Sequence, residues 1–205
     1  MSVVARKNGE IFSAFLPDCA MSHSVLLMQT IDDVLKRANM RLDECDFFAA
    51  AVGAGSFTGI RIGISATKGF ALATGKPTLG VTSFDTLAYN AIDGYLDGTL
   101  DGSKKILCLI NALHDCYYAC GYENGQVVYE PAFLTEAEVL ELVSQGFSLV
   151  ASGEIPVAEK ASVEIVSPIL GLQNAVSALC EKENVFGELS ALYVRKSSAE
   201  INLCK

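Results

Sequence analysis

The feature that most constrains the fold of this chain is an apolar run followed by a glycine-rich turn. The run Asp46–Gly53 (DFFAAAVG) holds one charged residue and continues into Gly53–Gly63 (GAGSFTGIRIG). Continuously apolar runs are typical of strands that are covered on both faces. A helix is expected to follow from about Gly59 to Thr74, because Gly75 and Pro77 then supply a C-terminal stop. A buried strand, a tight turn and a helix predict an α/β fold.

The rest of the first half is predicted from turn signals and periodicity. Strands are expected at Ser2–Arg6, Glu10–Leu16 and Thr78–Val81, with helices from Ser22 or Ser24 to about Asn39 and from a Ser83 cap to about Ile92.

The second half is predicted in the same way. Strands are expected at Ile106–Asn111, Cys116–Glu123, Gln126–Pro131, Ser148–Ser152 and Val163–Val166, with helices from a Thr135/Glu138 capping box to about Gln145 and over Ile169–Glu183. The tail Leu192–Lys196 is expected to be ordered by its apolar residues.

The two halves share one order of elements: strands, helix, strand, helix. We therefore divide the chain into residues 1–93, an Asp-Gly-rich linker at 94–105, and residues 106–205. The second half opens with three strands and the first with two. If the halves are copies of one unit, the first has lost its opening strand, which in such a unit lies in the middle of the sheet.

Composition excludes several classes of protein. The 205 residues are 51% hydrophobic, which is too apolar for a disordered chain. The net charge is −9 and both halves are acidic, so a free-standing binder of tRNA or DNA is not expected. The most apolar stretch, Ile60–Thr78, is interrupted by three cations, and the N-terminus lacks the apolar core of a signal peptide. Seven cysteines without a CxxC pair predict reduced thiols in a cytoplasmic protein.

The glycine-rich turn has two interpretations. Converging backbone N–H groups, a helix N-terminus and nearby hydroxyl and guanidinium groups could hold an anion or a nucleotide phosphate. Alternatively, the glycines serve a tight turn that packs closely. Neither the P-loop ending nor the dinucleotide glycine spacing is present. The residues of the candidate anion or nucleotide loop are Gly53, Gly55, Ser56, Thr58, Gly59 and Arg61.

The helix after the turn carries a ridge of small residues at helical spacing: Gly59, Gly63, Ala66, Gly69 and Ala73. Glycine inside a helix costs about 1 kcal/mol relative to alanine, so three glycines indicate that another backbone comes close to this helix. The neighbour is either the protein's own sheet or a helix of a partner.

These segments resemble the TsaB (YeaZ) family, the non-catalytic paralogue in bacterial synthesis of tRNA threonylcarbamoyladenosine. The family pattern GPGSFTGLRIG matches Gly53–Gly63 with Ala54 for proline and Ile60 for leucine. Further similar segments are His23-Ser24 with Leu26-Leu27 and Ile31, then Ala66–Ala71, Thr82–Ala88, Ile110–Ala112 and Tyr193–Arg195.

The resemblance implies a duplicated ribonuclease-H-like fold of the actin-like ATPase (ASKHA) class. It implies a scaffold that activates a TsaD-type catalytic subunit, with a TsaE-type ATPase joining the assembly and homodimers forming in isolation. ATP and metal are then expected in the partner subunits, with no cofactor here, and tRNA is contacted only through the complex. The expected interface comprises His23, Leu27, Ile31, Gly59, Gly63, Ala66, Gly69, Phe70 and Ala73.

The chain departs from the family pattern at two places. The family's opening strand, which ends in Asp-Thr-Ser, does not precede Ser2, and Asn111 stands where the family often has an acid. Missing carboxylates argue against a stand-alone actin-like ATPase or kinase. A glycoprotease-like metallopeptidase would need paired histidines, whereas His23 and His114 are single residues. His23 is expected at a helix start or interface, and His114 in solvent. We therefore expect a protein that is not itself an enzyme.

Overall fold

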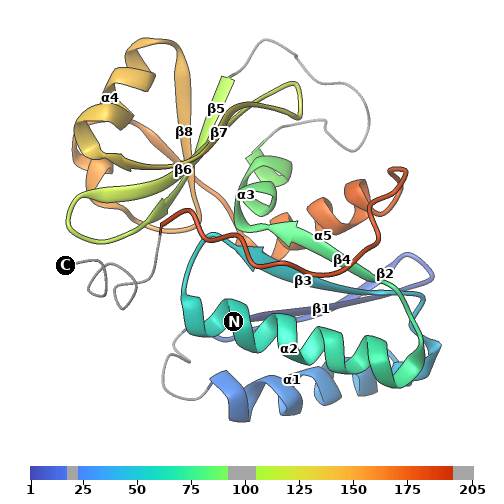
Figure 1. Ribbon diagram of the computed structural model, residues 1–205. Coiled ribbons are helices and arrows are strands. Elements are labelled where there is room, and N and C mark those ends of the chain that lie inside the picture. Colours follow the sequence, from blue (N-terminus) through green and yellow to red (C-terminus); the bar gives the residue numbers. More distant parts are fainter. Residues whose placement is uncertain (18–22, 92–104, 196–205) are drawn as a thin grey trace, which may run out of the picture.

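The computed structural model describes residues 1–17, 23–91 and 105–195 as an α/β protein with mixed sheets (Figure 1). The largest sheet has the strand order β7-β6-β5-β8-β9. Its central strand β5 is antiparallel to β6 and parallel to β8. The five strands are β5 (Lys105–Asn111), β6 (Cys116–Glu123), β7 (Gln126–Thr135), β8 (Phe147–Ala151) and β9 (Val163–Ile165).

The first part of the chain forms two separate two-stranded sheets. β1 (Ser2–Lys7) pairs with β2 (Glu10–Phe15) in an antiparallel hairpin, and β3 (Phe48–Gly53) pairs with β4 (Thr78–Thr82) in parallel. Positive φ angles at Asn8 and Gly9 produce the hairpin turn, as predicted. The helices among the described residues are α1 (His23–Arg37), α2 (Phe57–Thr74), α3 (Ser83–Ala91), α4 (Glu136–Ser144) and α5 (Pro168–Leu179), with short 3-10 turns at Leu42–Glu44 and Pro156–Glu159.

Most predicted elements are confirmed, and the corrections lie at their ends. α2 begins at Phe57 rather than Gly59, because the Ser56 side chain caps it. β7 runs past Pro131 to Thr135, and α5 ends at Leu179 rather than Glu183. The predicted capping box of Thr135 and Glu138 is confirmed.

Two further caps differ from the predictions. Ser83 is the first residue of α3, and the cap is Thr82: its hydroxyl accepts from the Asp85 N–H, while Asp85 Oδ2 accepts from the Thr82 N–H. Ser24 lies inside α1, which ends at Arg37, and Ser22 lies outside the described residues. Residues 94–104 of the predicted linker and Lys196 of the predicted tail also lie outside the described residues.

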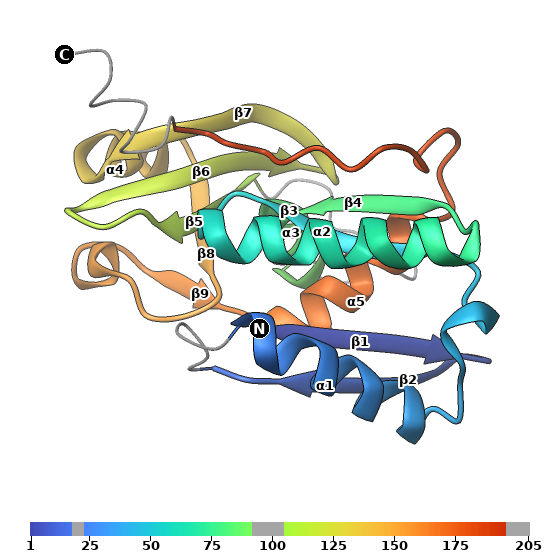
Figure 2. The same ribbon diagram turned by 60° about the horizontal axis from the view of Figure 1, so that its bottom comes forward.

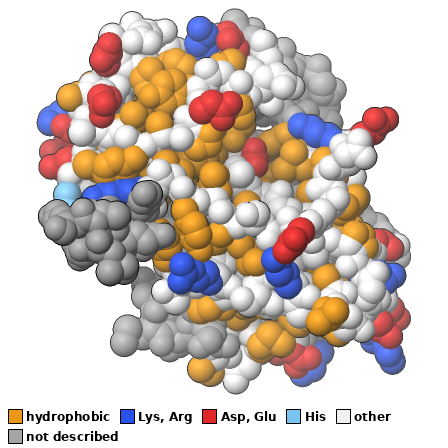
Figure 3. All heavy atoms as spheres, in the orientation of Figure 1, with side chains coloured by type: hydrophobic (Ala, Val, Ile, Leu, Met, Phe, Trp, Pro, Cys, Tyr) orange, Lys and Arg blue, Asp and Glu red, His pale blue; other side chains and the backbone are white. Residues whose placement is uncertain are grey.

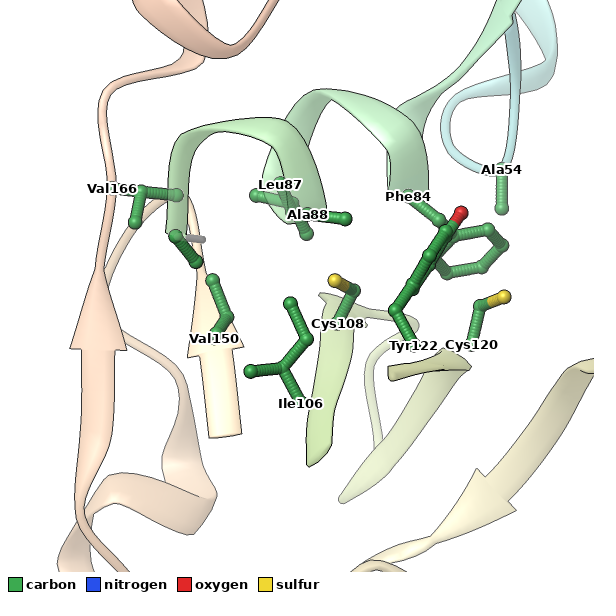
Figure 4. Close-up of a cluster of buried hydrophobic side chains, with 11 residues drawn as sticks. Ala54, Phe84, Leu87, Ala88, Ile106, Cys108, Cys120, Tyr122, Val150 and Val166 are labelled. Atoms are coloured by element: carbon green, nitrogen blue, oxygen red, sulfur yellow. The ribbon is translucent and has the colours of Figure 1, made fainter. Parts of the chain in front are cut away.

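β5 has a hydrophobic core on each of its faces. Ile106 and Cys108 point to the side of α3, where Phe84 and Tyr122 pack (Figure 4). Leu107 and Leu109 point to the other side, which is covered by α4. Because both faces are buried, the strand is apolar throughout its middle, as is typical of a central strand.

Close packing of α3 against α5 joins the two halves of the chain. A Cβ atom at Gly171 of α5 would overlap the carbonyl oxygen of Thr86 in α3. The Asn90 side chain donates a hydrogen bond to the Ser167 carbonyl oxygen over 2.8 Å, and Asn174 donates one to the Tyr89 carbonyl oxygen over 3.3 Å. Only a residue without a side chain allows this approach.

The segment 186–195, which we call the C-terminal strap, returns from α5 across the first half (Figure 1). Phe186 forms a bridge with Leu79, and the Leu192 N–H donates to the Val52 carbonyl oxygen over 2.7 Å. Leu189 is buried with Ile60 and Ile64 of α2. The predicted order of the tail is thus confirmed as far as residue 195. No helix in the described part of the chain is both long and apolar enough to cross a membrane.

Gly171→Ala should lower the free energy of unfolding by about 1–3 kcal/mol, because the added methyl group overpacks the α3–α5 contact. The matched control is Gly63→Ala in α2, where a Cβ atom would meet nothing within 4 Å. There the higher helix propensity of alanine should raise stability by up to about 1 kcal/mol. Urea denaturation measures both variants, and equal stabilisation by both would contradict the close α3–α5 packing.

Candidate protein interface and the glycine-rich turn

The candidate interface is built on α2, whose ends are fixed by local interactions. The Ser56 hydroxyl accepts from the Gly59 N–H over 3.4 Å at the N-terminus, and Gly75 in the left-handed conformation ends the helix with φ 71°. Between these caps, Ile60, Ile64 and Thr67 are buried toward β3 and the C-terminal strap. The direction of this buried stripe determines which side of α2 faces outward.

The small residues of α2 lie away from the buried stripe. Gly69 and Ala73 are exposed, and Gly63 and Ala66 are half-buried. A Cβ atom at Gly63 or Gly69 would meet nothing within 4 Å, and one at Gly59 would meet only the Ser56 cap. The close approach that the glycines would permit is therefore not used by the described part of this chain.

Exposed apolar side chains continue this surface on α1 and at the end of α2. Leu72 is 89% exposed, Val25 65% and Met28 51%. Separate patches of hydrophobic side chains lie among polar ones in the lower part of the face, where α1 and α2 lie (Figure 3). We call the outward surface of α1 and α2, from Val25 to Lys36 and from Gly59 to Ala73, the α1–α2 face. Exposed apolar side chains of this size make the α1–α2 face a candidate interaction site.

The predicted interface residues differ in how accessible they are in the structure. Leu27 and Ile31 are half-buried on the side of α1 opposite Val25, and the Phe70 ring lies 5.7 Å from that of Phe48. His23 begins α1, and its side chain lies outside the described residues. The predicted interface did not include Leu72, Val25 or Met28. The signal that could have identified them is the number of apolar residues in α1 and α2, which is larger than one buried face needs.

The glycine-rich turn lies beneath the C-terminal strap. Gly53 has φ +121°, and a Cβ atom there would overlap the Leu192 carbonyl oxygen. Ala54 is buried and points toward Phe84 and Tyr122 (Figure 4). Ser56 accepts the Gly59 N–H as described above, whereas Gly55 is half-buried and Thr58 is exposed. In this geometry Gly53 serves the close packing of one backbone segment on another.

Arg61 belongs to a cluster of aromatic and cationic side chains beside the turn. Its Nε donates to the Tyr193 hydroxyl over 2.9 Å, and its guanidinium lies 5.7 Å from the Tyr193 ring centre and 5.9 Å from that of Phe57. The two rings stack at 4.7 Å. About two helical turns further on, Lys68 forms an ion pair of 3.0 Å with Glu188.

An open groove of about 480 Å³ runs between α2 and the strap. Arg61, Ser65 and Lys68 line it from the helix, and Glu188 and Tyr193 line it from the strap. Both cations that enter the groove have partners from the strap, so they hold the strap on α2.

Asn111 and His114, which were considered as candidate catalytic groups, lie at the end of β5 and in the turn that follows it. Asn111 lies at the end of β5, where its Oδ1 accepts from the Leu113 N–H over 2.8 Å. His114 is exposed in the same turn, as predicted. Among the described residues, no three His, Cys, Asp or Glu side chains are grouped as they would be to hold a metal ion.

The buried ionisable groups belong to the core between the halves. The Tyr122 hydroxyl donates to Asp85 over 2.9 Å, and burial raises the pKa of Tyr122. Burial likewise raises the pKa of Cys120 to about 12 and that of Cys108 well above its usual value. Thiols with such pKa values are poor nucleophiles. Cys108 and Cys120 are buried, while Cys116 is half-buried.

Three comparisons place the chain among known proteins. Residues 14–203 match the family model described as TsaD: tRNA N6-adenosine threonylcarbamoyltransferase. The chain is 30% identical over 123 residues to the tRNA threonylcarbamoyladenosine biosynthesis protein TsaB of Escherichia coli, an alignment that spans 60% of this chain and 51% of that protein. It is 28% identical over 106 residues to the tRNA N6-adenosine threonylcarbamoyltransferase of Clostridium botulinum, with 49% and 29% covered.

The solved structures agree with this likeness at the level of the fold. YeaZ from Pseudomonas aeruginosa has a TM-score of 0.71 at 24% identity, with 94% of this chain and 93% of that chain covered. A second P. aeruginosa structure, described as similar to peptidase YEAZ, has a TM-score of 0.73 at 23% identity, with 95% and 94% covered. The chain spans about half the length of the TsaB relatives that it matches.

Gly53→Ala should detach the strap from β3, because its methyl group would occupy the position of the Leu192 carbonyl oxygen. We expect hydrogen exchange of the Leu192 amide to accelerate at least tenfold. Gly55→Ala is the matched control: Gly55 also has a positive φ, +148°, but a Cβ atom there meets nothing within 4 Å. Equal acceleration in both variants would show that backbone strain, rather than close approach, makes glycine necessary at Gly53.

Proposed function

Since the chain belongs to the tRNA N6-adenosine threonylcarbamoyltransferase (TsaD) family, we propose that it acts in the synthesis of tRNA threonylcarbamoyladenosine as a docking subunit. In this role it contributes a protein-binding surface, and a TsaD-type catalytic subunit carries the chemistry. The observation that supports the proposal best is the α1–α2 face, where apolar side chains are exposed and a Cβ atom at Gly63 or Gly69 would meet nothing within 4 Å.

The shape of the α1–α2 face favours a helix as its partner. Small residues at Gly63, Ala66, Gly69 and Ala73 allow an opposing helix to approach closely along α2. Val25, Met28 and Leu72 then provide apolar area at its border. Helix-on-helix packing buries both the ridge and this border in one contact.

The same surface accounts for a second copy of the chain as an alternative partner. A second copy of the chain can cover the α1–α2 face when no catalytic subunit is present, which gives a homodimer. A TsaE-type ATPase joins the assembly of the two subunits, and tRNA is bound only through the complex. A chain with a net charge of −9 leaves contact with RNA phosphates to more basic subunits. We place this assembly in the cytoplasm.

The positions of the polar groups support a role without catalysis in this chain. Asn111 and His114 lie in one exposed turn, and the thiols of Cys108 and Cys120 are buried with raised pKa values. ATP and metal are accordingly assigned to the partner subunits. No observation favours a metallopeptidase or a stand-alone ATPase. The glycine-rich loop with Ser56, Thr58 and Arg61 stays a prediction as an anion or nucleotide site.

Strand order supports a duplicated ribonuclease-H-like unit of the actin-like class. In the order β7-β6-β5-β8-β9, a meander of three antiparallel strands is followed by two strands parallel to the first of them. The sheets β2-β1 and β3-β4 correspond to this arrangement without its central member. We therefore infer that residues 1–93 and 106–205 are two copies joined by 94–105, and that no described strand of the first copy corresponds to β5.

Docking is tested by Gly69→Arg and Ala73→Arg in the full-length chain, mixed with a TsaD-type catalytic subunit. Each arginine projects from the exposed side of α2, so the affinity for that subunit should fall at least tenfold. The yield of threonylcarbamoyladenosine in a reconstituted assay should fall with it. Thermal unfolding should change little, because both positions are exposed and arginine favours a helix.

Ala137→Arg in α4 is the control, since it places the same side chain on an exposed helix of the second half. It should leave affinity and modification intact. The docking role is contradicted if Gly69→Arg and Ala137→Arg bind equally well. ATP turnover or peptide cleavage by the purified chain alone would contradict the assignment of the chemistry to a partner.

A further inference from the structure

The C-terminal strap is attached to the first half through one small core cluster. Leu189 of the strap is 4% exposed and packs with Ile60 and Ile64 of α2 and with Ala50 and Val52 of β3. The strap thus supplies one wall of the cluster in which α2 is buried. Removal of the strap would expose the inner face of the helix on that side.

The other contacts between the strap and α2 lie at the surface. The side chains of Lys68 and Glu188, which form an ion pair, are 43% and 88% exposed. The hydrogen bond from Arg61 to Tyr193 is exposed as well, and an open groove lies between the helix and the strap. Water competes for such contacts, so they add little net stability. The strap can therefore detach at a lower free energy than unfolding of the whole chain requires.

The strap and the α1–α2 face lie on different sides of α2. Both ribbon views show the strap on one side of this helix and α1 on the other (Figure 1, Figure 2). Arg61, Ser65 and Lys68 line the groove beside the strap, whereas Gly69 and Ala73 are exposed and do not line it. A partner on the α1–α2 face therefore contacts α2 from a side that the strap leaves open.

Both surfaces depend on the rotation of α2 about its axis. The docked strap fixes this rotation, because Leu189 holds Ile60 and Ile64 inward. The same rotation points Gly69 and Ala73 outward. Detachment of the strap removes a wall of the core beneath α2 and so loosens the position of the surface that a partner meets.

We propose that docking of the strap and binding of the TsaD-type subunit are coupled, an inference that rests on the proposed docking function. With the strap docked, α2 presents the α1–α2 face and the subunit binds. With the strap detached, α2 is no longer held in this rotation and the affinity is lower. Such coupling is reciprocal: the factor by which the docked strap raises the affinity is also the factor by which the bound subunit favours docking of the strap.

Hydrogen exchange of two strap amides tests the coupling in the unmodified chain. The N–H groups of Gly187 and Leu192 donate to carbonyl oxygens of β4 and β3, so they exchange when the strap detaches. In the free chain both should exchange at least tenfold faster than the central amides of β5, which open only on wider unfolding. Equal rates would show that the strap does not detach on its own and would overturn the proposal. A saturating TsaD-type subunit should slow exchange of both amides at least fivefold.

A charge in place of Leu189 measures the same factor from the side of binding. Leu189→Glu should detach the strap, because an unpaired carboxylate is not stable in an apolar cluster. The affinity for the subunit should then fall by the factor by which the subunit slows exchange in the unmodified chain. Ser190→Glu is the matched control, since it places the same charge on the exposed neighbouring residue and should change neither exchange nor affinity. The exchange experiment decides alone if Leu189→Glu does not fold.

The outcomes separate the coupling from docking itself. Gly69→Arg, which blocks the α1–α2 face, should abolish the slowing and leave exchange in the free chain unchanged. If the unmodified chain binds the subunit but exchange at Gly187 and Leu192 does not slow, the coupling is wrong and the docking function stands. If it does not bind, both are wrong. The coupling is also wrong if the exposed rings of Phe186 and Tyr193 become protected from oxidation in the complex, because the subunit then covers the strap directly.

Discussion

The account depends on the division of α2 into two faces, one buried in the core and the other exposed to solvent. One face buries Ile60, Ile64 and Thr67 against β3 and the C-terminal strap, which fixes the rotation of the helix about its axis. That rotation turns Gly69 and Ala73 outward. Glycine inside a helix lowers the free energy of unfolding, and the described packing around the outward ridge does not compensate for this loss. Close contact with a helix of a partner would compensate for the lost stability.

Long-range contacts hold this face in position. The strap connects α2 to residues more than a hundred positions away, through Arg61 with Tyr193 and Lys68 with Glu188. Gly171 lets α5 approach α3, and Tyr122 reaches Asp85 across the same junction. The first half, which has less core of its own around β1 and β2, therefore depends on the second half for much of its packing.

Features set by neighbouring residues could be predicted from the sequence. The Asn8-Gly9 and Asn124-Gly125 turns, the Thr135–Glu138 capping box and the Gly75 helix end require only a few adjacent residues, and all are present. Thr82 and Ser83 have similar capping propensities, so the choice of Thr82 depended on the position of Asp85 relative to the helix start.

The rest depends on tertiary structure. The exposure of Leu72 follows from the direction in which α2 packs, which periodicity alone does not determine. The contact of Gly53 with Leu192 joins segments that no local pattern connects. The glycine ridge was predicted with two alternative neighbours, and the open space at Gly63 and Gly69 excludes the described sheet as that neighbour. The predicted interface itself awaits a binding measurement.

The most direct measurement is hydroxyl-radical footprinting of the chain, alone and mixed with a TsaD-type catalytic subunit. Met28 and Leu72 are exposed reporters on the α1–α2 face, while Val128 and Leu170 are exposed reporters elsewhere. The account predicts that oxidation of Met28 and Leu72 falls several-fold in the mixture, with Val128 and Leu170 unchanged. Protection of Val128 or Leu170 in the mixture, with Met28 and Leu72 still oxidised at the rate of the free chain, would contradict it.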